Sequence, residues 1–238
     1  MISEKISTLV LIRHGRSLRN VYETAGPFYE NNEQRRKVGI SQDRLIPLVE
    51  EGWEQARGAG KGIRELFGVP NYLFNSGFVR TKQTTEGILE AYSAEELKSL
   101  TIIESHLIRE RNPGYLWNFT VAEVEKFFPW WEEYWRKADP FITFPLGGES
   151  MASICEGRLA AFLRNLDGEL AYVPGGSKVF VVSHGRAILG MRYLLENWNY
   201  ERIHSALRNE NPPNCSVTWY QFDNSGKAEL QFANKVFY

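Results

Sequence analysis

The sequence predicts an α/β fold, a three-layer α/β/α sandwich with a mostly parallel central sheet. Two short apolar runs carry this prediction, Thr8 to Ile12 near the start of the chain and Lys178 to Ser183 near its end. Both runs are rich in β-branched and aliphatic residues, which is typical of strands buried on both faces. Helical patterns occupy the sequence between them, and strands that alternate with helices favour a parallel sheet covered by helices.

The remaining elements follow from residue spacing. The segment Tyr72 to Asn75 is typical of a further strand, and a helix is expected after the second apolar run, through about Glu196. Val217 to Phe222 and Glu229 to Ala233 resemble the two strands of a closing hairpin. Four segments have the apolar spacing of helices: Glu50 to Phe67, Val79 to Tyr92, Val121 to Lys137 and Ser150 to Tyr172.

We expect one domain over residues 1–238, because neither an internal repeat nor a long Pro/Gly/Ser linker divides the chain. The segment 112–146 differs from the rest and is predicted to be an inserted cap. It carries eleven aromatic residues, with five acidic and three basic ones. Most of these aromatic side chains are expected to pack against one another under the insertion, in preference to forming a ligand-binding wall.

Composition excludes several classes of function. The 28 Lys and Arg residues nearly balance the 29 Asp and Glu residues, so we expect no nucleic-acid partner. The apolar run Leu9 to Ile12 is too short for a signal peptide or a membrane span, which predicts a cytoplasmic protein with no membrane partner. Cys155 and Cys215 form no CxxC pair, and both are expected to be small buried residues. A homo-oligomer is left open.

Histidine and arginine are the residues left to carry chemistry. The chain has no HExxH or paired CxxC motif, no GxxxxGK[ST] phosphate loop and no GxSxG nucleophile elbow. His14-Gly15 follows the first buried strand and His184-Gly185 follows the second. Ligands of parallel sheets bind at the carboxyl ends of the strands, so both histidines are expected at one site. The two glycines would let backbone amides approach an anion at helix N-termini.

These residue types suit the cleavage of a phosphomonoester without a metal ion. A neutral imidazole can attack phosphorus if fixed positive charge neutralises the phosphoryl oxygens and an acid protonates the departing alkoxide. His14 is the candidate nucleophile, with Arg13, Arg80 and His184 around the phosphoryl oxygens. The guanidinium fork matches phosphate geometry, and the neighbouring charges would depress the pKa of His14 and keep it neutral.

The same residues lie in motifs that resemble those of the histidine phosphatase superfamily, which includes the cofactor-dependent phosphoglycerate mutases. Arg13 to Asn20 resembles the family's RHGxSxxN signature, and Ser76 to Thr84 resembles its SxxxRxxQT segment. The matches occur in the family's order across nearly the whole chain. Three more segments take part: Leu107 to Glu110, Gly147 to Ser150 and Val182 to Gly185.

The resemblance implies a phosphoglycerate mutase-like fold, a phosphohistidine at His14 and a proton donor at Glu110. Glu104 and Glu149 remain alternatives for the acid, although Glu149 more naturally begins the helix that follows Gly147-Gly148. No cofactor and no metal ligand are implied. The predicted catalytic set is His14, Glu110, His184, Arg13 and Arg80, and the predicted substrate-binding set is Gly15, Ser17, Asn20 and Gly185.

The leading hypothesis for function is a phosphatase that acts on a small phosphorylated substrate. A mutase is the alternative, and it would need additional positive charge to hold a bisphosphorylated intermediate, which the mildly acidic cap does not offer. Arg186, or the basic run Arg35 to Lys37 in an expected loop, could supply that charge. A non-catalytic binding module is less favoured, because the nucleophile, the acid and both arginines are all present.

Overall fold

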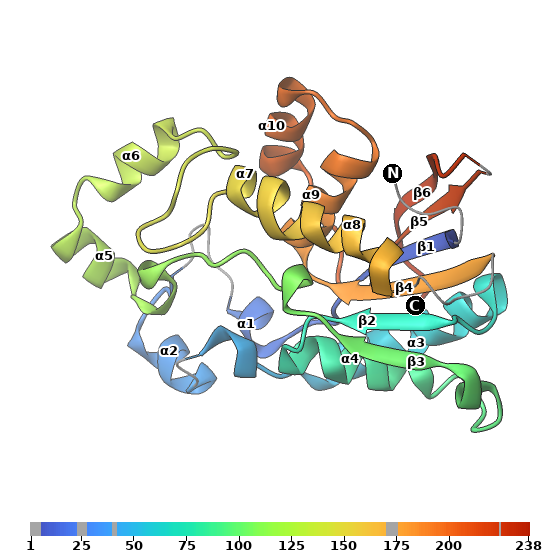
Figure 1. Cartoon of the computed structure of the whole chain (residues 1–238). Helices are drawn as coiled ribbons and strands as arrows, with labels where there is room; N and C mark the ends of the chain where they lie inside the picture. The colour runs from blue at the N-terminus through green and yellow to red at the C-terminus, as the bar shows by residue number, and fades with distance from the viewer. Residues whose placement is uncertain (1–5, 23–27, 40–41, 170–175, 224) are drawn as a thin grey trace.

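A computed structural model of the chain describes residues 6–22, 28–39, 42–169, 176–223 and 225–238. It contains a six-stranded sheet in the order β3-β2-β4-β1-β5-β6, which lies between two layers of helices (Figure 1). The predicted α/β fold with a mostly parallel sheet is therefore confirmed. Four strands are parallel, β1 (Ile6–Arg13), β2 (Tyr72–Asn75), β3 (Thr101–Glu104) and β4 (Ser177–Ser183), and two are antiparallel, β5 (Val217–Phe222) and β6 (Ala228–Lys235).

Strands β1 and β4 lie side by side in the centre of the sheet, as the two apolar runs predicted. Leu9 and Leu11 of β1 belong to the core on one face, and Val10 and Ile12 belong to the core on the other. Because successive strand residues point to opposite faces, a strand covered on both sides must be apolar at every position. This double burial explains why both runs are continuous rather than alternating.

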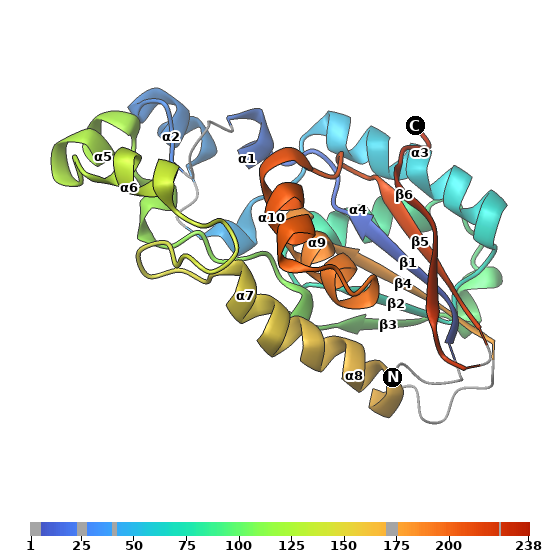
Figure 2. The ribbon, with the colours of Figure 1, turned by 90° about the horizontal axis from the view of Figure 1, so that it is seen from above.

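Helices α3 (Glu50–Phe67) and α4 (Val79–Leu89) cover the face that carries Val10 and Ile12. The other face is covered by three helices and one π-helical turn, and α10 packs beside α9 (Figure 2). These elements are α7 (Met151–Ile154), the π-helical turn η5 (Cys155–Leu159), α8 (Ala160–Glu169), α9 (Gly185–Leu195) and α10 (Tyr200–Asn209). Cys155 and Cys215 are both buried, as expected.

Two details of the predicted elements were wrong. The helix expected over Val121 to Lys137 is two helices, α5 (Val121–Phe127) and α6 (Trp131–Lys137). Pro129 lies between them, and proline disfavours helical backbone in the residue before it. Helix α4 ends at Leu89 and not at Tyr92. The end of the helix predicted over Ser150 to Tyr172, residues 170–172, lies outside the described residues.

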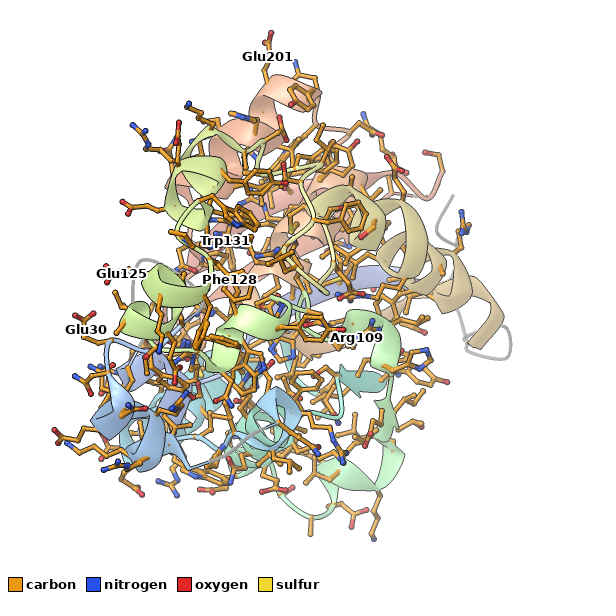
Figure 3. The ribbon with its side chains drawn as sticks, turned by 90° about the vertical axis from the view of Figure 1, so that its left-hand side faces the viewer. Glu30, Arg109, Glu125, Phe128, Trp131 and Glu201 are labelled. Atoms are coloured by element: carbon orange, nitrogen blue, oxygen red, sulfur yellow. The ribbon has the colours of Figure 1, made fainter. Side chains whose placement is uncertain are left out.

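The aromatic segment 112–146 forms a separate layer of packing at one end of the molecule, where α5 and α6 lie away from the sheet (Figure 1). Leu116, Val124 and Trp131 are the buried residues of one hydrophobic cluster in it, with Phe128 packed against them. Figure 3 looks onto this end. The expected packing is present only in part: six of the eleven aromatic side chains are at least partly buried, whereas Tyr115, Phe127, Trp130, Tyr134 and Phe144 are exposed. The assignment of this segment as a cap within a single domain stays a prediction.

The basic run lies in helix α2 (Asn32–Val38) and not in a loop. Arg35 forms an ion pair of 2.7 Å with Glu123 at the start of α5, which joins α2 to the aromatic layer. Lys37 pairs with Glu33 within its own helix. Within the described residues, no helix is both long enough and apolar enough to cross a membrane.

Candidate active site

The carboxyl ends of the four parallel strands meet at one edge of the sheet. His14 follows β1, Ser76 follows β2 and His184 follows β4, while the segment after β3 leads to Glu110. The amide of His14 donates to the carbonyl of Ser183, 2.9 Å away, so the two central strands hold both histidines in register. The rings of His14 and His184 contact edge to face, with centroids 5.1 Å apart. The expectation that the two histidines share one site is confirmed.

A cavity of about 340 Å³ lies at this edge. Seven of the nine predicted site residues line it, and their roles in binding or catalysis remain predictions. His184 lies behind His14 without lining the cavity, and Gly15 does not line it either. The seven are Arg13, His14, Ser17, Asn20, Arg80, Glu110 and Gly185.

His14 is held in the tautomer that a nucleophile requires. Its Nδ1 lies 2.7 Å from the carbonyl oxygen of Gly15, and because a carbonyl only accepts, Nδ1 carries the proton. The Nε2 lone pair then accepts from Nε of Arg80 at 3.3 Å. Burial, followed by the charges of Arg80 and Arg13, holds the pKa of His14 well below its ordinary value of 6.5. The imidazole is therefore neutral at physiological pH and presents Nε2 to the cavity.

Arg80 is oriented by a carboxylate that the sequence analysis did not single out. Asp43 accepts from Nη1 at 3.0 Å and from Nη2 at 3.1 Å, and its carbonyl also accepts from Nη1 at 2.7 Å. This bidentate pair occupies the outer edge of the guanidinium. The edge that carries Nε consequently faces Nε2 of His14, where a phosphoryl group would have to lie.

Arg13 and His184 complete the positive and polar wall around His14. Nη1 of Arg13 donates to Asn211 Oδ1 at 3.2 Å and to the carbonyl of Pro212, so the loop after α10 fixes this side chain. Nε2 of His184 bonds to Ser76 Oγ at 2.8 Å. Its Nδ1 is buried without a hydrogen-bond partner among the described residues.

The expectation for Gly15 was wrong. Its amide donates to Thr84 Oγ1 at 2.9 Å, and the next helix, α1 (Leu18–Val21), begins three residues later. A Cβ atom at this position would lie 2.4 Å from the carbonyl oxygen of Gly52, so glycine is needed for close backbone packing. Gly185 is the first residue of α9, where the predicted anion contact at a helix N-terminus remains open to it.

Ser17 and Asn20 line the cavity and also build the local backbone. The Ser17 side chain accepts from the Asn20 amide, and Asn20 Oδ1 accepts from the Ser17 amide at 3.1 Å. This reciprocal capping box starts α1 directly after the nucleophile loop. The two residues therefore have a structural reason for their place, beside the predicted contact with substrate.

Of the three carboxylates considered for the acid, only Glu110 lines the cavity. Its Oε1 accepts from the amide of Arg111 at 2.8 Å. Glu104 pairs with Lys82 at 2.6 Å, and more than half of its side chain is exposed. Glu149 pairs with Arg109 at 2.7 Å and with Arg158 at 3.4 Å. The geometry thus favours Glu110 for proton transfer to a group held beside His14.

The cavity carries more positive charge than the sequence analysis expected. Burial, followed by the charge of Arg186, lowers the pKa of Arg111, whose Nε has no hydrogen-bond partner among the described residues. The position of Arg111, next to Glu110, could have indicated its place, whereas nothing in the sequence marks Arg208 of α10. The described lining holds six arginines, Arg13, Arg19, Arg80, Arg111, Arg186 and Arg208, and three acidic residues, Asp43, Glu110 and Glu210.

The two buried histidines predict a loss of stability in acid. Burial is also the main cause that holds the pKa of His184 well below 6.5. The unfolded chain therefore binds more protons than the native one below about pH 6.5, and stability falls as the pH falls. Each histidine is expected to cost about 1.4 kcal/mol in the free energy of unfolding per pH unit below about pH 6.5.

The measurement is urea unfolding of the wild type and of His184→Asn at about pH 7.5 and about pH 5.5. The variant is expected to lose less of its own stability than the wild type over this interval, by about 1.4 kcal/mol. An equal loss in both proteins would show that the pKa of His184 is the same in the native and the unfolded state.

Comparisons with known proteins agree with this geometry. Residues 9–235 match the family model of the histidine phosphatase superfamily (branch 1). Over 193 aligned residues, the chain is 30% identical to a 2,3-bisphosphoglycerate-dependent phosphoglycerate mutase of Rhizobium etli. The alignment covers 80% of this chain and 81% of that relative.

Solved structures give the same fold. YhfR of Bacillus stearothermophilus superposes with a TM-score of 0.71 at 20% identity, covering 96% of this chain and 97% of that one. A mycobacterial glucosyl-3-phosphoglycerate phosphatase, solved with VO3, superposes with a TM-score of 0.66 at 20% identity, covering 95% of this chain and 98% of that one. At this identity the likeness shows the fold alone.

Proposed function

The chain belongs to the histidine phosphatase superfamily, and on this premise we propose that it is a phosphatase that hydrolyses a small phosphomonoester through a phosphohistidine at His14. One observation carries the proposal. The neutral His14 presents its Nε2 lone pair, 3.3 Å from Arg80, to the same cavity that Glu110 lines. Nucleophile, positive charge and acid thus surround one space.

In the first step, Nε2 of His14 attacks phosphorus and the bond from phosphorus to the ester oxygen breaks. Glu110, as the acid, gives its proton to the departing alkoxide, so that an alcohol leaves. Arg13 and Arg80 offset the charge of the phosphoryl oxygens during transfer. The positive charge in this scheme comes from arginine side chains, with no metal ion.

In the second step, water attacks the phosphorus of the phosphohistidine. The Glu110 carboxylate accepts a proton from this water, the bond from phosphorus to nitrogen breaks, and inorganic phosphate leaves His14 neutral. Glu110 is protonated again and ready for the next ester. His14 and Glu110 serve in both steps, because the alcohol that leaves in the first step is replaced by water in the second.

A mutase is the second candidate, and the arginines of the cavity favour it. The sequence-based objection to a mutase was wrong, because the charged residues of the predicted cap do not line the cavity. Of the segment 112–146, only Pro113 and Trp117 are among the described lining residues. A doubly phosphorylated intermediate needs positive charge at both ends, which Arg111 and Arg186 could provide. Against this, Asp43 and Glu210 offset part of that charge.

Two assays on one preparation test the proposal. Phosphate release from a panel of small phosphomonoesters is expected to exceed the interconversion of 2- and 3-phosphoglycerate, even with 2,3-bisphosphoglycerate present. The physical reason is that hydrolysis needs only water at the phosphohistidine, whereas a mutase must retain a highly charged intermediate. Bisphosphoglycerate-stimulated interconversion orders of magnitude faster than phosphate release would instead establish the mutase.

A further inference from the structure

We propose that Arg158 and Glu149, an ion pair that does not line the cavity, are positioning residues that hold Glu110 in place for proton transfer. The inference rests on the proposed role of Glu110 as the acid. Neither residue contacts the space beside His14. Both act on the backbone of the segment 107–112, which carries Glu110.

This segment runs from the end of the short turn η3 (His106–Ile108) into an irregular loop. A loop without a regular hydrogen-bond pattern must find other partners for its buried backbone groups. Ser183 Oγ donates to the carbonyl of Ile108 at 2.7 Å, so β4 holds the loop at this residue. Arg158 and Glu149 hold the loop at other residues.

Arg158 reaches two carbonyls of the loop with one guanidinium. Its Nη1 donates to the carbonyl of Leu107 at 2.7 Å, and its Nη2 donates to the carbonyl of Glu110 itself at 3.2 Å. Its Nε faces Glu149 Oε1 at 3.4 Å. Only 8% of the Arg158 side chain is exposed, so these bonds are shielded from water. Such a planar fork holds two acceptors at a fixed separation, which lysine cannot do.

Arg158 lies in the π-helical turn η5, between α7 and α8. Turns of this type are rare within helices and are often found at functional sites. Here the turn carries Arg158, whose side chain joins this helix to the carbonyl of Glu110. The π-helical turn thus lies where this helix contacts the segment 107–112, which carries Glu110.

Glu149 holds the loop on the other side of Glu110. Its Oε1 accepts from Arg109 at 2.7 Å, its Oε2 accepts from the amide of Asn112 at 2.9 Å, and its carbonyl accepts from Arg111 Nη1 at 3.1 Å. Residues on both sides of Glu110 are therefore tied to Glu149. Together, Arg158 and Glu149 thus hold the backbone at Leu107, Glu110 and Asn112, and Glu149 also binds the side chains of the two residues next to Glu110.

Loss of this support should disturb the proton transfer more than the attack by His14. A displacement of about 1 Å at a catalytic group can cost on the order of 100-fold in rate. The nucleophile and Arg80 are held by other elements, since Asp43 orients Arg80 and Gly15 orients His14. The expected defect is therefore specific to leaving groups that need a proton.

The test uses p-nitrophenyl phosphate, whose phenolate leaves unaided, and benzyl phosphate, whose alkoxide needs a proton. Arg158→Met is expected to lower kcat/KM, which reports the first step alone, about 100-fold for benzyl phosphate and only a few-fold for p-nitrophenyl phosphate. In a Glu110→Gln background, where the acid is already absent, Arg158→Met should lower the rate with benzyl phosphate by less than a further factor of about three. Arg192→Met is the matched control, because Arg192 is also a buried arginine, paired at 2.8 Å with Glu196. It is expected to lower thermal stability and to leave the ratio of the two rates unchanged.

Equal losses on the two substrates, or a full further loss in the Glu110→Gln background, would overturn the inference while leaving Glu110 as the acid. If Glu110→Gln itself failed to discriminate between the substrates, the acid role in the proposed function would fall, and the inference with it. Should Arg158→Met not fold, Glu149→Gln provides the same test, since it keeps the shape of the side chain and removes its charge.

Discussion

Replacement of His14 by Ala is expected to lower kcat/KM by about four orders of magnitude or more, because His14 is the only histidine among the described residues that line the cavity. The fold should persist. The side chain lies at the carboxyl end of β1, and the backbone bonds of residue 14 to Ser183, Cys215 and Asn214 do not involve the imidazole. Steady-state kinetics and thermal melting of the same samples separate the two effects.

His204→Ala is the matched control. His204 lies on α10 and does not line the cavity, and its ring is 3.8 Å from Asp139. We expect nearly wild-type turnover from this variant. A His14→Ala protein that is folded and retains most of its activity would show that phosphoryl transfer proceeds by direct attack of water, without a covalent intermediate on this residue.

Replacement of Glu110 by Gln is expected to lower kcat/KM for benzyl phosphate, which reports the first step alone, by about 10² to 10⁴, the usual worth of a positioned general acid. Glutamine keeps the size of the side chain and removes the transferable proton. The loss on p-nitrophenyl phosphate should be much smaller, because its leaving group needs no proton.

Glu104→Gln serves as the comparison for Glu110, since Glu104 pairs with Lys82 away from the cavity. It should leave both rates close to the wild type. An equal loss on both substrates in Glu110→Gln would assign this carboxylate to binding or charge balance, and the proton would have to come from another group.

The centre of the fold could be predicted because the residues that cause it follow one another in the sequence. β1 and β4 are buried on both faces, so every position is apolar, and the residue after each strand must lie at the same edge of the sheet. The antiparallel pairing of β5 and β6 was also predictable from two strand-like runs around a turn. β3 was missed because it is an edge strand with mostly exposed side chains.

The site was predictable only where its residues lie in local motifs. His14, Arg13 and Arg80 belong to such motifs, and the structure brings them together. Asp43 and Arg208 come from segments whose approach to the cavity depends on tertiary packing, which one sequence does not encode locally. The segment 112–146 shows the opposite error. Its net charge was used as an argument against a mutase, although its charged side chains lie outside the cavity.

The most direct test of the account is to trap the phosphoryl group on the protein. The enzyme is mixed with a labelled phosphomonoester, quenched within one turnover and digested for peptide mass spectrometry. We expect a phosphorylated peptide that contains His14, labile in acid, stable in alkali and absent from His14→Ala. A turnover-competent enzyme that carries no label at any time, or that carries an acid-stable label on another residue, would contradict it.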